Sequence, residues 1–187
     1  MTSGPERLEA LLQGQSYEVA PLLLGSIVAT GSGQDRTAVM LTEVEAYAGR
    51  EDPASHAYRG ETPRNRSMFG EAGTLYVYRS YGLHWCMNVV VGAAGTPHAI
   101  LLRGGHPVAG EDLMAVRRGR DDHLTDGPGK LCQALGVDGE ADGSTVFRGP
   151  VTLGPGSLPE NTAVEATPRV GISRATDVPW RWIVTGW

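Results

Sequence analysis

The sequence predicts one mixed α/β domain over residues 1–187, built from short antiparallel strands. Length is the first reason, since 187 residues suffice for one well-buried core and are few for two. The second is that apolar segments of strand length are separated by glycine, proline and polar turns. The third is the lack of any repeat, low-complexity tract or clear linker, which favours a single domain.

Two helical segments and a strand are expected at the N-terminus. The segment from Ser3 to Glu6 resembles a capping box, so a short helix should run over residues 6–13 and stop at Gly14. Residues 20–24 should be helical, with Gly25 as the C-terminal stop. A strand over residues 26–30 and a polar loop follow.

A strand over residues 38–47 carries two carboxylates and then a tyrosine. Successive side chains of a strand point to opposite faces, so this strand should present one ordinary core face and one face that turns acidic and aromatic. The core face would carry Met40, Thr42, Val44 and Ala46, and the other face Val39, Leu41, Glu43, Glu45 and Tyr47. An edge strand with two solvated glutamates is the simplest alternative.

Residues 49–73 predict no regular element, because the segment is polar, punctuated by proline and without periodicity. A loop this long in a compact domain is usually functional or disordered. Its arginine, histidine, asparagine and aromatic content favours a functional loop.

A hairpin should follow this loop, with strands over residues 75–78 and 85–91. Gly82 can take the positive φ that a tight turn needs, so Tyr81 falls near the tip, where a large ring is poorly buried. The later expected elements are a strand over residues 99–103 that ends at Arg103, helices over 110–118 and 129–135, and short strands in the last third.

Composition narrows the protein class. No apolar run approaches the ~18 residues of a membrane span, and the N-terminus lacks the order of a signal peptide, so we expect a cytoplasmic protein without a membrane partner. Cys86 and Cys132 lie among apolar neighbours and should be reduced, buried thiols. No cysteine or histidine spacing fits a metal site, so no metal is expected.

The net charge of −5 argues against a nucleic-acid partner, because a phosphate footprint normally needs a basic surface. The distribution is more favourable than the total. Five arginines accompany only two glutamates between His56 and Arg103, which is a local charge of +3.

Several motifs occur in order along the chain, and their combination is specific although each alone is weak. They are Glu43-x-Glu45-Ala-Tyr47, Glu51-Asp52-x-Ala-x-His56, Thr62-Pro-Arg-Asn-Arg66-x-Met68-Phe69, Tyr76-Val-Tyr78-x-x-Tyr81-Gly82 followed by Asn88, Gly127-Pro-Gly-Lys130 and Arg169-Val-Gly171. With these motifs the chain resembles the alkyladenine (3-methyladenine) DNA glycosylase family over nearly its whole length. The resemblance implies a curved, mainly antiparallel sheet from which the hairpin bearing Tyr81 protrudes toward DNA.

The resemblance also implies a reaction. A glycosylase of base excision repair would flip an alkylated or deaminated purine out of duplex DNA and hydrolyse its N-glycosidic bond. Glu45 would be the general base that activates water, and Arg103 would help hold that carboxylate and the water. Tyr81 would fill the gap that the flipped nucleotide leaves.

The same family implies a pocket of aromatic walls, because alkylated purines are electron-poor and attract ring faces. Tyr47, His56 and Tyr78 would form these walls. Asn88 would lie beside the base and disfavour normal guanine by crowding its exocyclic amine. The sequence leaves open the preference among 3-methyladenine, 7-methylguanine, hypoxanthine and ethenoadenine.

The lysine count decides between two mechanisms. A glycosylase that also cuts the DNA backbone uses an amine to form a Schiff base. The one lysine, Lys130, follows Gly-Pro-Gly at a predicted helix start, a position suited to phosphate contact. We therefore expect a monofunctional enzyme with water as the nucleophile, and the resemblance implies no cofactor. The expected contacts to the DNA backbone are Arg64, Arg66, Gly129 and Lys130.

Two features depart from this simple picture. His106 stands where the family usually has a glutamate before a proline, which affects the hydrogen bonding expected around Arg103. Glu43 lies on the same predicted face as Glu45, and two close carboxylates push their titrations apart. We expect Glu43 to pair with an arginine between Arg59 and Arg66 and to be structural.

Three alternatives follow from the residues alone. Paired carboxylates also define sugar hydrolases, but Glu43 and Glu45 share a strand face instead of facing each other across a cleft. A non-catalytic reader of damaged DNA on the same fold would keep the arginines and Tyr81 but lose the base, and the intact Glu45 argues against it. The third is an α/β domain of another purpose.

We expect the protein to be a monomer whose partner is double-stranded DNA containing damaged purines. If the protein is bacterial, we expect it to be associated with the nucleoid.

Overall fold

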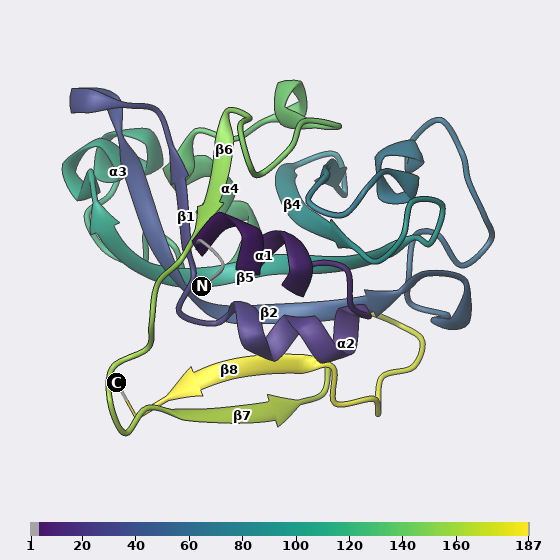
Figure 1. Cartoon of the computed structure of the whole chain (residues 1–187). Coiled ribbons are helices and arrows are strands. Elements are labelled where there is room, and N and C mark those ends of the chain that lie inside the picture. Colours follow the sequence, from purple (N-terminus) through teal and green to yellow (C-terminus); the bar gives the residue numbers. More distant parts are fainter. Residues whose placement is uncertain (1–3, 187) are drawn as a thin grey trace.

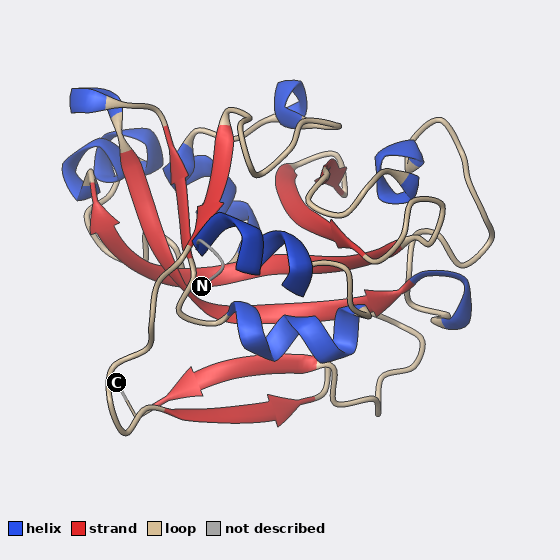
Figure 2. Cartoon of the chain, viewed as in Figure 1, coloured by secondary structure: helices blue, strands red, loops and turns tan. Residues whose placement is uncertain are grey.

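Eight strands form one sheet in the computed structural model, which describes residues 4–186 (Figures 1 and 2). All its pairings are antiparallel, which confirms the predicted mixed α/β class with an antiparallel sheet. The strands are β1 (Ile27–Thr30), β2 (Thr37–Ala48), β3 (Leu75–Ser80), β4 (His84–Val91), β5 (His98–Ala109), β6 (Val151–Gly154), β7 (Ala163–Thr167) and β8 (Arg181–Thr185).

The strand order is β3-β4-β5-β2-β1-β6, and β8 pairs with β2 beyond the end of β1. The final hairpin β7–β8 therefore lies beside the middle of the sheet, below β2 in Figure 1. Its pairing brings the C-terminal segment to Glu43, Val44 and Glu45.

Short helices flank the sheet. The predicted helix near residue 6 is α1 (Gly4–Leu11), whereas Ser3 of the expected capping box lies outside the described residues. The second predicted helix is instead a four-residue α2 (Ser16–Val19) continued by the 3-10 helix η1 (Ala20–Leu23), because Pro21 begins a new turn. The others are α3 (Glu111–Arg118), α4 (Pro128–Leu135), η2 (Gly33–Asp35), η3 (Gly49–Glu51), η4 (Arg66–Phe69) and η5 (Gly139–Ala141).

Strand β5 is longer than the sequence predicted. It continues through Gly104 and Gly105 to Ala109, so the prediction that Arg103 ends its strand is wrong. Pairing with β2 extends across this segment, and a Cβ at Gly105 would lie 2.3 Å from the carbonyl oxygen of Met40. Glycine is therefore what allows the two backbones to approach here, where the sequence suggested a strand break.

An irregularity in the β2–β5 ladder exchanges the two faces of β2 along its length, so the predicted core face is right for Val44 and Ala46 but wrong before the irregularity. The register shifts between Leu41 and Glu43 and again between Glu43 and Val44. The residues of β2 in the main core are consequently Val39 and Leu41 before the shift but Val44 and Ala46 after it. The prediction that places Val39 and Leu41 with the glutamates is wrong, and so is the prediction of Met40 on the same face as Val44.

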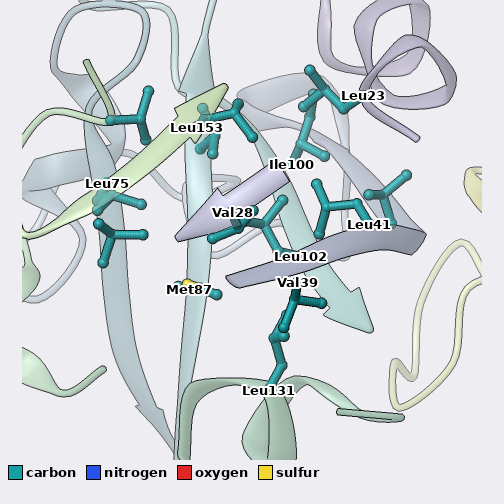
Figure 3. Close-up of a cluster of buried hydrophobic side chains, with 14 of the residues drawn as sticks. Leu23, Val28, Val39, Leu41, Leu75, Met87, Ile100, Leu102, Leu131 and Leu153 are labelled. Atoms are coloured by element: carbon teal, nitrogen blue, oxygen red, sulfur yellow. The ribbon is translucent and has the colours of Figure 1, made fainter. Parts of the chain in front are cut away.

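The main core joins the sheet to its helices, and Figure 3 labels members from strands β1, β2 and β5 together with Leu131 of α4. A second, smaller cluster lies under the segment over residues 49–73 and contains Ala57, Met68, Tyr76, Val90 and Ala99. The segment is thus packed on the sheet through its own apolar residues, and short 3-10 turns η3 and η4 lie within it.

The hairpin β3–β4 has the predicted tip. Tyr81 and Gly82 both have positive φ, 49° and 70°, and the backbone N–H of Leu83 donates to the carbonyl of Ser80 at 2.9 Å. A tight turn with two residues of positive φ has a backbone twist that matches the twist of the two hairpin strands. Tyr81 is 90% exposed there, which confirms its expected position at the tip.

Cys86 and Cys132 are free and buried, as expected. Among the residues that the structure describes, no helix has the length and apolar character to cross a membrane. Residues 4–186 also contain no group of three or more histidine, cysteine, aspartate or glutamate side chains arranged to hold a metal ion.

We predict that Leu102→Ala lowers the free energy of unfolding by about 2–5 kcal/mol, because the fully buried leucine leaves a cavity in the main core. Urea denaturation followed by circular dichroism measures the change. Leu83→Ala is the matched control, since Leu83 is 71% exposed and Leu102 only 1%. Equal losses in the two variants would contradict the packing described here.

Candidate active site

A row of paired residues crosses four strands on the face opposite the main core. Glu45 on β2 pairs with Leu101 on β5, Leu101 with Asn88 on β4, and Asn88 with Tyr76 on β3. Directly paired residues place their side chains on the same face of a sheet. The antiparallel pairing therefore brings the predicted base and the predicted pocket residue Asn88 to one surface.

Glu45 is completely buried and its carboxylate is held by three donors. The backbone N–H of Val170 donates to Oε1 at 2.8 Å, and the hydroxyl of Tyr47 donates to Oε2 at 2.8 Å. A guanidinium nitrogen of Arg103 lies 3.3 Å from the same Oε2. A buried charge is tolerated only when it is paired and hydrogen-bonded, and these contacts supply both conditions.

Arg103 joins the two glutamates of the opening strand motif. Its Nε donates to Glu43 Oε1 at 2.7 Å while its other end faces Glu45. Burial works to lower the pKa of Arg103, but the charges of Glu45 and Glu43 outweigh it and raise that pKa. Arg103 therefore remains a cation fixed between two carboxylates.

Glu43 has partners different from those expected. Besides Arg103, it accepts a hydrogen bond from Nε of Arg181 on β8, at 2.5 Å. The prediction of a partner between Arg59 and Arg66 is wrong, because β8 pairs with β2 at this point and brings Arg181 alongside. Arg181 is itself oriented by a bond to Thr167 Oγ1 at 3.1 Å.

Aromatic rings gather beside the carboxylate. The rings of His56 and Tyr78 meet edge to face with centroids 4.5 Å apart, and Tyr76 stacks on Tyr78 at 5.3 Å. The hydroxyl of Tyr76 is hydrogen-bonded to Nδ1 of His56 at 2.9 Å. Tyr47 joins this group through its bond to Glu45, so the predicted wall residues lie around one site.

Burial, with the charge of Glu45 as the second cause, raises the pKa of Tyr47. Burial also raises the pKa of Tyr78 and of Tyr76, and it lowers the pKa of His56. The three tyrosines are therefore neutral donors at neutral pH, and His56 is a neutral imidazole. The site presents neutral rings next to one compensated carboxylate.

Asn88 is buried, and its side-chain amide donates to the carbonyl oxygen of Tyr76 at 3.0 Å. This bond fixes the orientation of the amide on the face of the sheet that carries Glu45. The neighbouring strand β3 thereby holds the side chain of Asn88 in place through the backbone of Tyr76.

The loop that carries His56 is fastened by Asn65. The buried side chain of Asn65 accepts hydrogen bonds from the backbone N–H and hydroxyl of Thr62, and it donates to the carbonyls of His56 and Gly60 at 3.0 Å. All these contacts lie within one loop, which explains how a polar segment without periodicity is ordered. Sequence reasoning quoted Asn65 in a motif but gave it no role.

The predicted DNA-contact residues lie on the surface around the hairpin and the loop. Arg64 and Arg66 are exposed, and Arg66 lies 3.6 Å from Glu61. Gly129 in the first turn of α4 is so close to His84, next to the hairpin tip, that a Cβ there would be 2.8 Å from the Cβ of His84. Lys130 is bonded to Asp126 at 2.9 Å.

His106 is exposed and pairs across the sheet with Met40. With Thr42, Gly105 and Val184 it lines a hollow of about 210 Å³. Arg103 has its carboxylate partners in Glu43 and Glu45, although position 106 carries a histidine where the resemblance implied a glutamate.

Sequence reasoning missed further residues that hold the site. Tyr76 fixes His56, Arg181 fixes Glu43, and a buried pair of Asp52 and Arg169 lies behind Tyr47. Tyr76, Asp52 and Arg169 belong to the motifs that carry the family resemblance. Membership of those motifs was the sequence signal that could have identified them as site residues. Arg181 carried no such signal, because its partner depends on the pairing of β8 with β2.

The fold and the site define an antiparallel α/β protein with a buried, hydrogen-bonded carboxylate beside aromatic side chains. Comparison with known families narrows this class. A profile of the family described as methylpurine-DNA glycosylase (MPG) matches residues 10–187, so the chain belongs to that family of DNA glycosylases. This membership places it among the hydrolases of DNA repair that act on DNA as N-glycosylases.

Three relatives of this chain carry the same name, "Putative 3-methyladenine DNA glycosylase". The protein of Agrobacterium fabrum is 46% identical over 185 residues, covering 97% of this chain and 90% of its own. That of Frankia casuarinae is 49% identical over 181 residues, covering 90% and 84%. That of Methanoculleus marisnigri is 46% identical over 184 residues, covering 95% and 94%.

We predict that the free energy of unfolding decreases as the pH falls below about 6.5, the ordinary pKa of histidine. Burial lowers the pKa of both His56 and His98, so the unfolded chain binds more protons than the folded chain in this range. Urea denaturation at a series of pH values between about 8 and 5 measures the slope. His98→Gln, which keeps a polar group near Ser16, should flatten it. An unchanged slope in both His98→Gln and His56→Gln would contradict the prediction.

Proposed function

We propose that the protein excises damaged purines from double-stranded DNA as a monofunctional glycosylase, with Glu45 as the base that activates water. The observation that carries this proposal is the buried carboxylate of Glu45, held by three donors on the same sheet face as the aromatic rings. A carboxylate in that setting can stabilise positive charge and accept a proton without changing its own position.

The reaction follows from the chemistry of the glycosidic bond. The bond between the base and C1′ breaks and its electron pair leaves with the base, so the sugar acquires oxocarbenium character. The anionic Glu45 stabilises that charge and takes a proton from water, whose oxygen then bonds to C1′, and the carboxyl group later returns this proton to solvent. A cationic alkylated purine leaves as a neutral base, whereas a neutral lesion takes up one proton from solvent as it leaves. The products are a free base and an abasic site in intact DNA.

Tyr47, His56 and Tyr78 are the proposed walls for the flipped base. Burial raises the pKa of Tyr47 and Tyr78 and lowers the pKa of His56, so all three rings are neutral at neutral pH. A cationic purine between them would therefore meet no repulsive positive charge from these walls. Stacking and cation–π attraction to an alkylated purine are worth about 0.5–2 kcal/mol per contact. Asn88, fixed by its bond to Tyr76, is placed to crowd the exocyclic amine of normal guanine.

Tyr81 is the proposed wedge. It projects from a tight turn and is 90% exposed, so its ring is free to enter the base stack and fill the space that the flipped nucleotide leaves. The first turn of α4 contacts the hairpin through Gly129 and His84, and it offers backbone N–H groups near this point. Arg64, Arg66 and Lys130 are the proposed partners of the phosphates.

Water is the proposed nucleophile in preference to an amine. The one lysine of the chain, Lys130, lies on α4 and is bonded to Asp126, whereas Glu45 lies on β2. An amine that attacks C1′ would have to stand where Glu45 and the rings meet. No strand cleavage is therefore expected to accompany base release.

We predict that Glu45→Gln lowers the single-turnover excision rate constant by about 10²–10⁴-fold, because the amide cannot accept the proton of water. Labelled duplexes with one 3-methyladenine-type, hypoxanthine or ethenoadenine lesion should show strand breaks only after alkali treatment of the wild-type reaction. Binding of the lesion duplex by Glu45→Gln should persist.

Breaks without alkali would contradict the absence of lyase activity, and excision by the variant at the wild-type rate would refute the role of Glu45. Lesion binding by wild type without excision would identify a non-catalytic reader.

We predict that Tyr81→Ala weakens binding of a lesion duplex by about 1–3 kcal/mol, the usual value of one stacked aromatic side chain. The gain in fluorescence of 2-aminopurine placed next to the lesion reports unstacking. Tyr81→Phe should retain most of both signals, since it keeps the ring. Val116→Ala is the control for removal of an exposed apolar side chain elsewhere. Unchanged capture and unstacking in Tyr81→Ala would show that the wedge lies on another residue.

A further inference from the structure

A fully buried ion pair lies directly behind the candidate site. Arg169 and Asp52 face each other with two parallel bonds, from NH1 to Oδ2 at 2.5 Å and from NH2 to Oδ1 at 2.9 Å, and neither side chain is exposed. The same NH1 donates to the carbonyl of Ala46 on β2 at 2.9 Å. A planar guanidinium is the group that matches this bidentate geometry.

The guanidinium of Arg169 lies over two aromatic rings. Its central carbon is 4.8 Å from the centroid of Tyr47 and 5.3 Å from that of Trp180, which in turn stacks on Tyr17 at 5.1 Å. Arg169 therefore occupies one face of Tyr47. A ligand that stacks on Tyr47 has only the opposite face, so the cation sets which side of the ring is open.

The residue after Arg169 contacts the proposed base. The backbone N–H of Val170 donates to Glu45 Oε1 at 2.8 Å. Pro168, Val170 and Gly171 are all exposed, and Arg169 alone in this stretch is buried. The position of the Val170 amide therefore depends on the anchoring of one side chain in the protein interior.

Asp52 connects the pair to the loop of His56. Its Oδ1 accepts from the backbone N–H of Ala54 at 3.0 Å, and its Oδ2 accepts from that of Ala48 at 3.3 Å. The carboxylate thus fixes the exit of β2 and the start of the loop while it holds Arg169. One pair links three chain segments that meet at the site.

The energetics of such a pair favour a geometric role. Burying two charges costs about as much as their attraction returns, and apolar replacements of both partners are often as stable. A pair that contributes little net stability but imposes a fixed, directional arrangement is suited to positioning. Displacement of a reacting group by about 1 Å can slow catalysis by about 10²-fold.

We infer that Arg169, locked by Asp52, is a positioning residue that sets the Val170 amide against Glu45 and leaves one face of Tyr47 open. This inference rests on the proposed function, because Glu45 and Tyr47 have their roles there. Arg169 touches neither the substrate nor the reacting atoms in this scheme. It acts through the backbone of Val170 and the ring of Tyr47.

The test is Arg169→Lys, which keeps the charge but cannot make the paired bonds to Asp52 together with the bond to Ala46. The single-turnover excision rate constant should fall by about 10²-fold, while the affinity for the lesion duplex should fall by less than about tenfold, a smaller loss because Tyr78 and His56 remain as pocket walls. Hydrogen exchange at the Val170 amide, followed by NMR, should accelerate in the free protein.

Arg117→Lys is the matched control. Arg117 is partly buried and donates to Thr37 Oγ1 at 3.1 Å and to the carbonyl of Ala134 at 3.0 Å, contacts that belong to α3, β2 and α4 and do not involve Glu45. Arg117→Lys should lower the stability of the protein. After correction for the folded fraction, the excision rate constant and the rate of Val170 amide exchange should equal those of the wild type. If Arg169→Lys does not fold, Asp52→Asn/Arg169→Met removes both charges together and leaves no unpaired buried ion.

The outcomes separate this inference from the proposed function. Slower excision with faster Val170 exchange in the Arg169 variants supports it. Excision at the wild-type rate by Arg169→Lys or the double variant overturns it, and so does slower excision with unchanged Val170 exchange. A further outcome is that the wild-type protein excises no lesion while the Arg169 variants still show faster Val170 exchange. That result would retain Arg169 as an anchor of the Val170 backbone. It would reject both the proposed function and the positioning of a catalytic base.

Discussion

The need to compensate a buried carboxylate organises this structure. Glu45 has no exposed surface, and its donors come from Tyr47 on its own strand, Arg103 on β5 and the backbone of Val170 near the C-terminus. A buried anion without such partners would be strongly destabilising or would take up a proton. Distant segments of the chain therefore meet at one point for an electrostatic reason. The same contacts fix the direction of the carboxylate, which is the condition for its proposed use as a base.

The irregular pairing of β2 and β5 supplies the geometry for that point. Leu41 and Val44 both enter the main core because the register shift between them reverses the alternation, and Glu43 and Glu45 are thereby turned to the opposite face. Arg103 stands in the matching irregularity of β5, where it reaches both glutamates. The bulge is thus the feature that separates a hydrophobic face from a charged face within one long strand.

The loop and the hairpin divide the remaining tasks. The segment over residues 49–73 covers the charged face through a small apolar cluster and the hydrogen bonds of Asn65, which hold His56 near Tyr78. The hairpin leaves Tyr81 in solvent at its tip, where Tyr81 and Gly82 turn the chain with positive φ. The proposed extraction of a base from duplex DNA would use both features, the ring-lined site for the flipped base and the exposed tyrosine as the wedge. Membership of the methylpurine-DNA glycosylase family is consistent with this use of the site.

Local chemistry in the sequence determined the hairpin with Tyr81 at its tip, most strands and helices, and the motifs that identify the family, because turn residues, periodicity and motif spacing act over a few residues. The ends of strands and helices near prolines and glycines were less predictable. Strand β5, for example, continues through Gly104 and Gly105 because β2 pairs with it there. Only the tertiary structure decided that Arg181 is a partner of Glu43, that the faces of β2 reverse, and that Asp52 and Arg169 lie behind Tyr47. Each of these depends on pairing between segments far apart in the chain, and no local pattern encodes which distant side chain will neutralise a given charge.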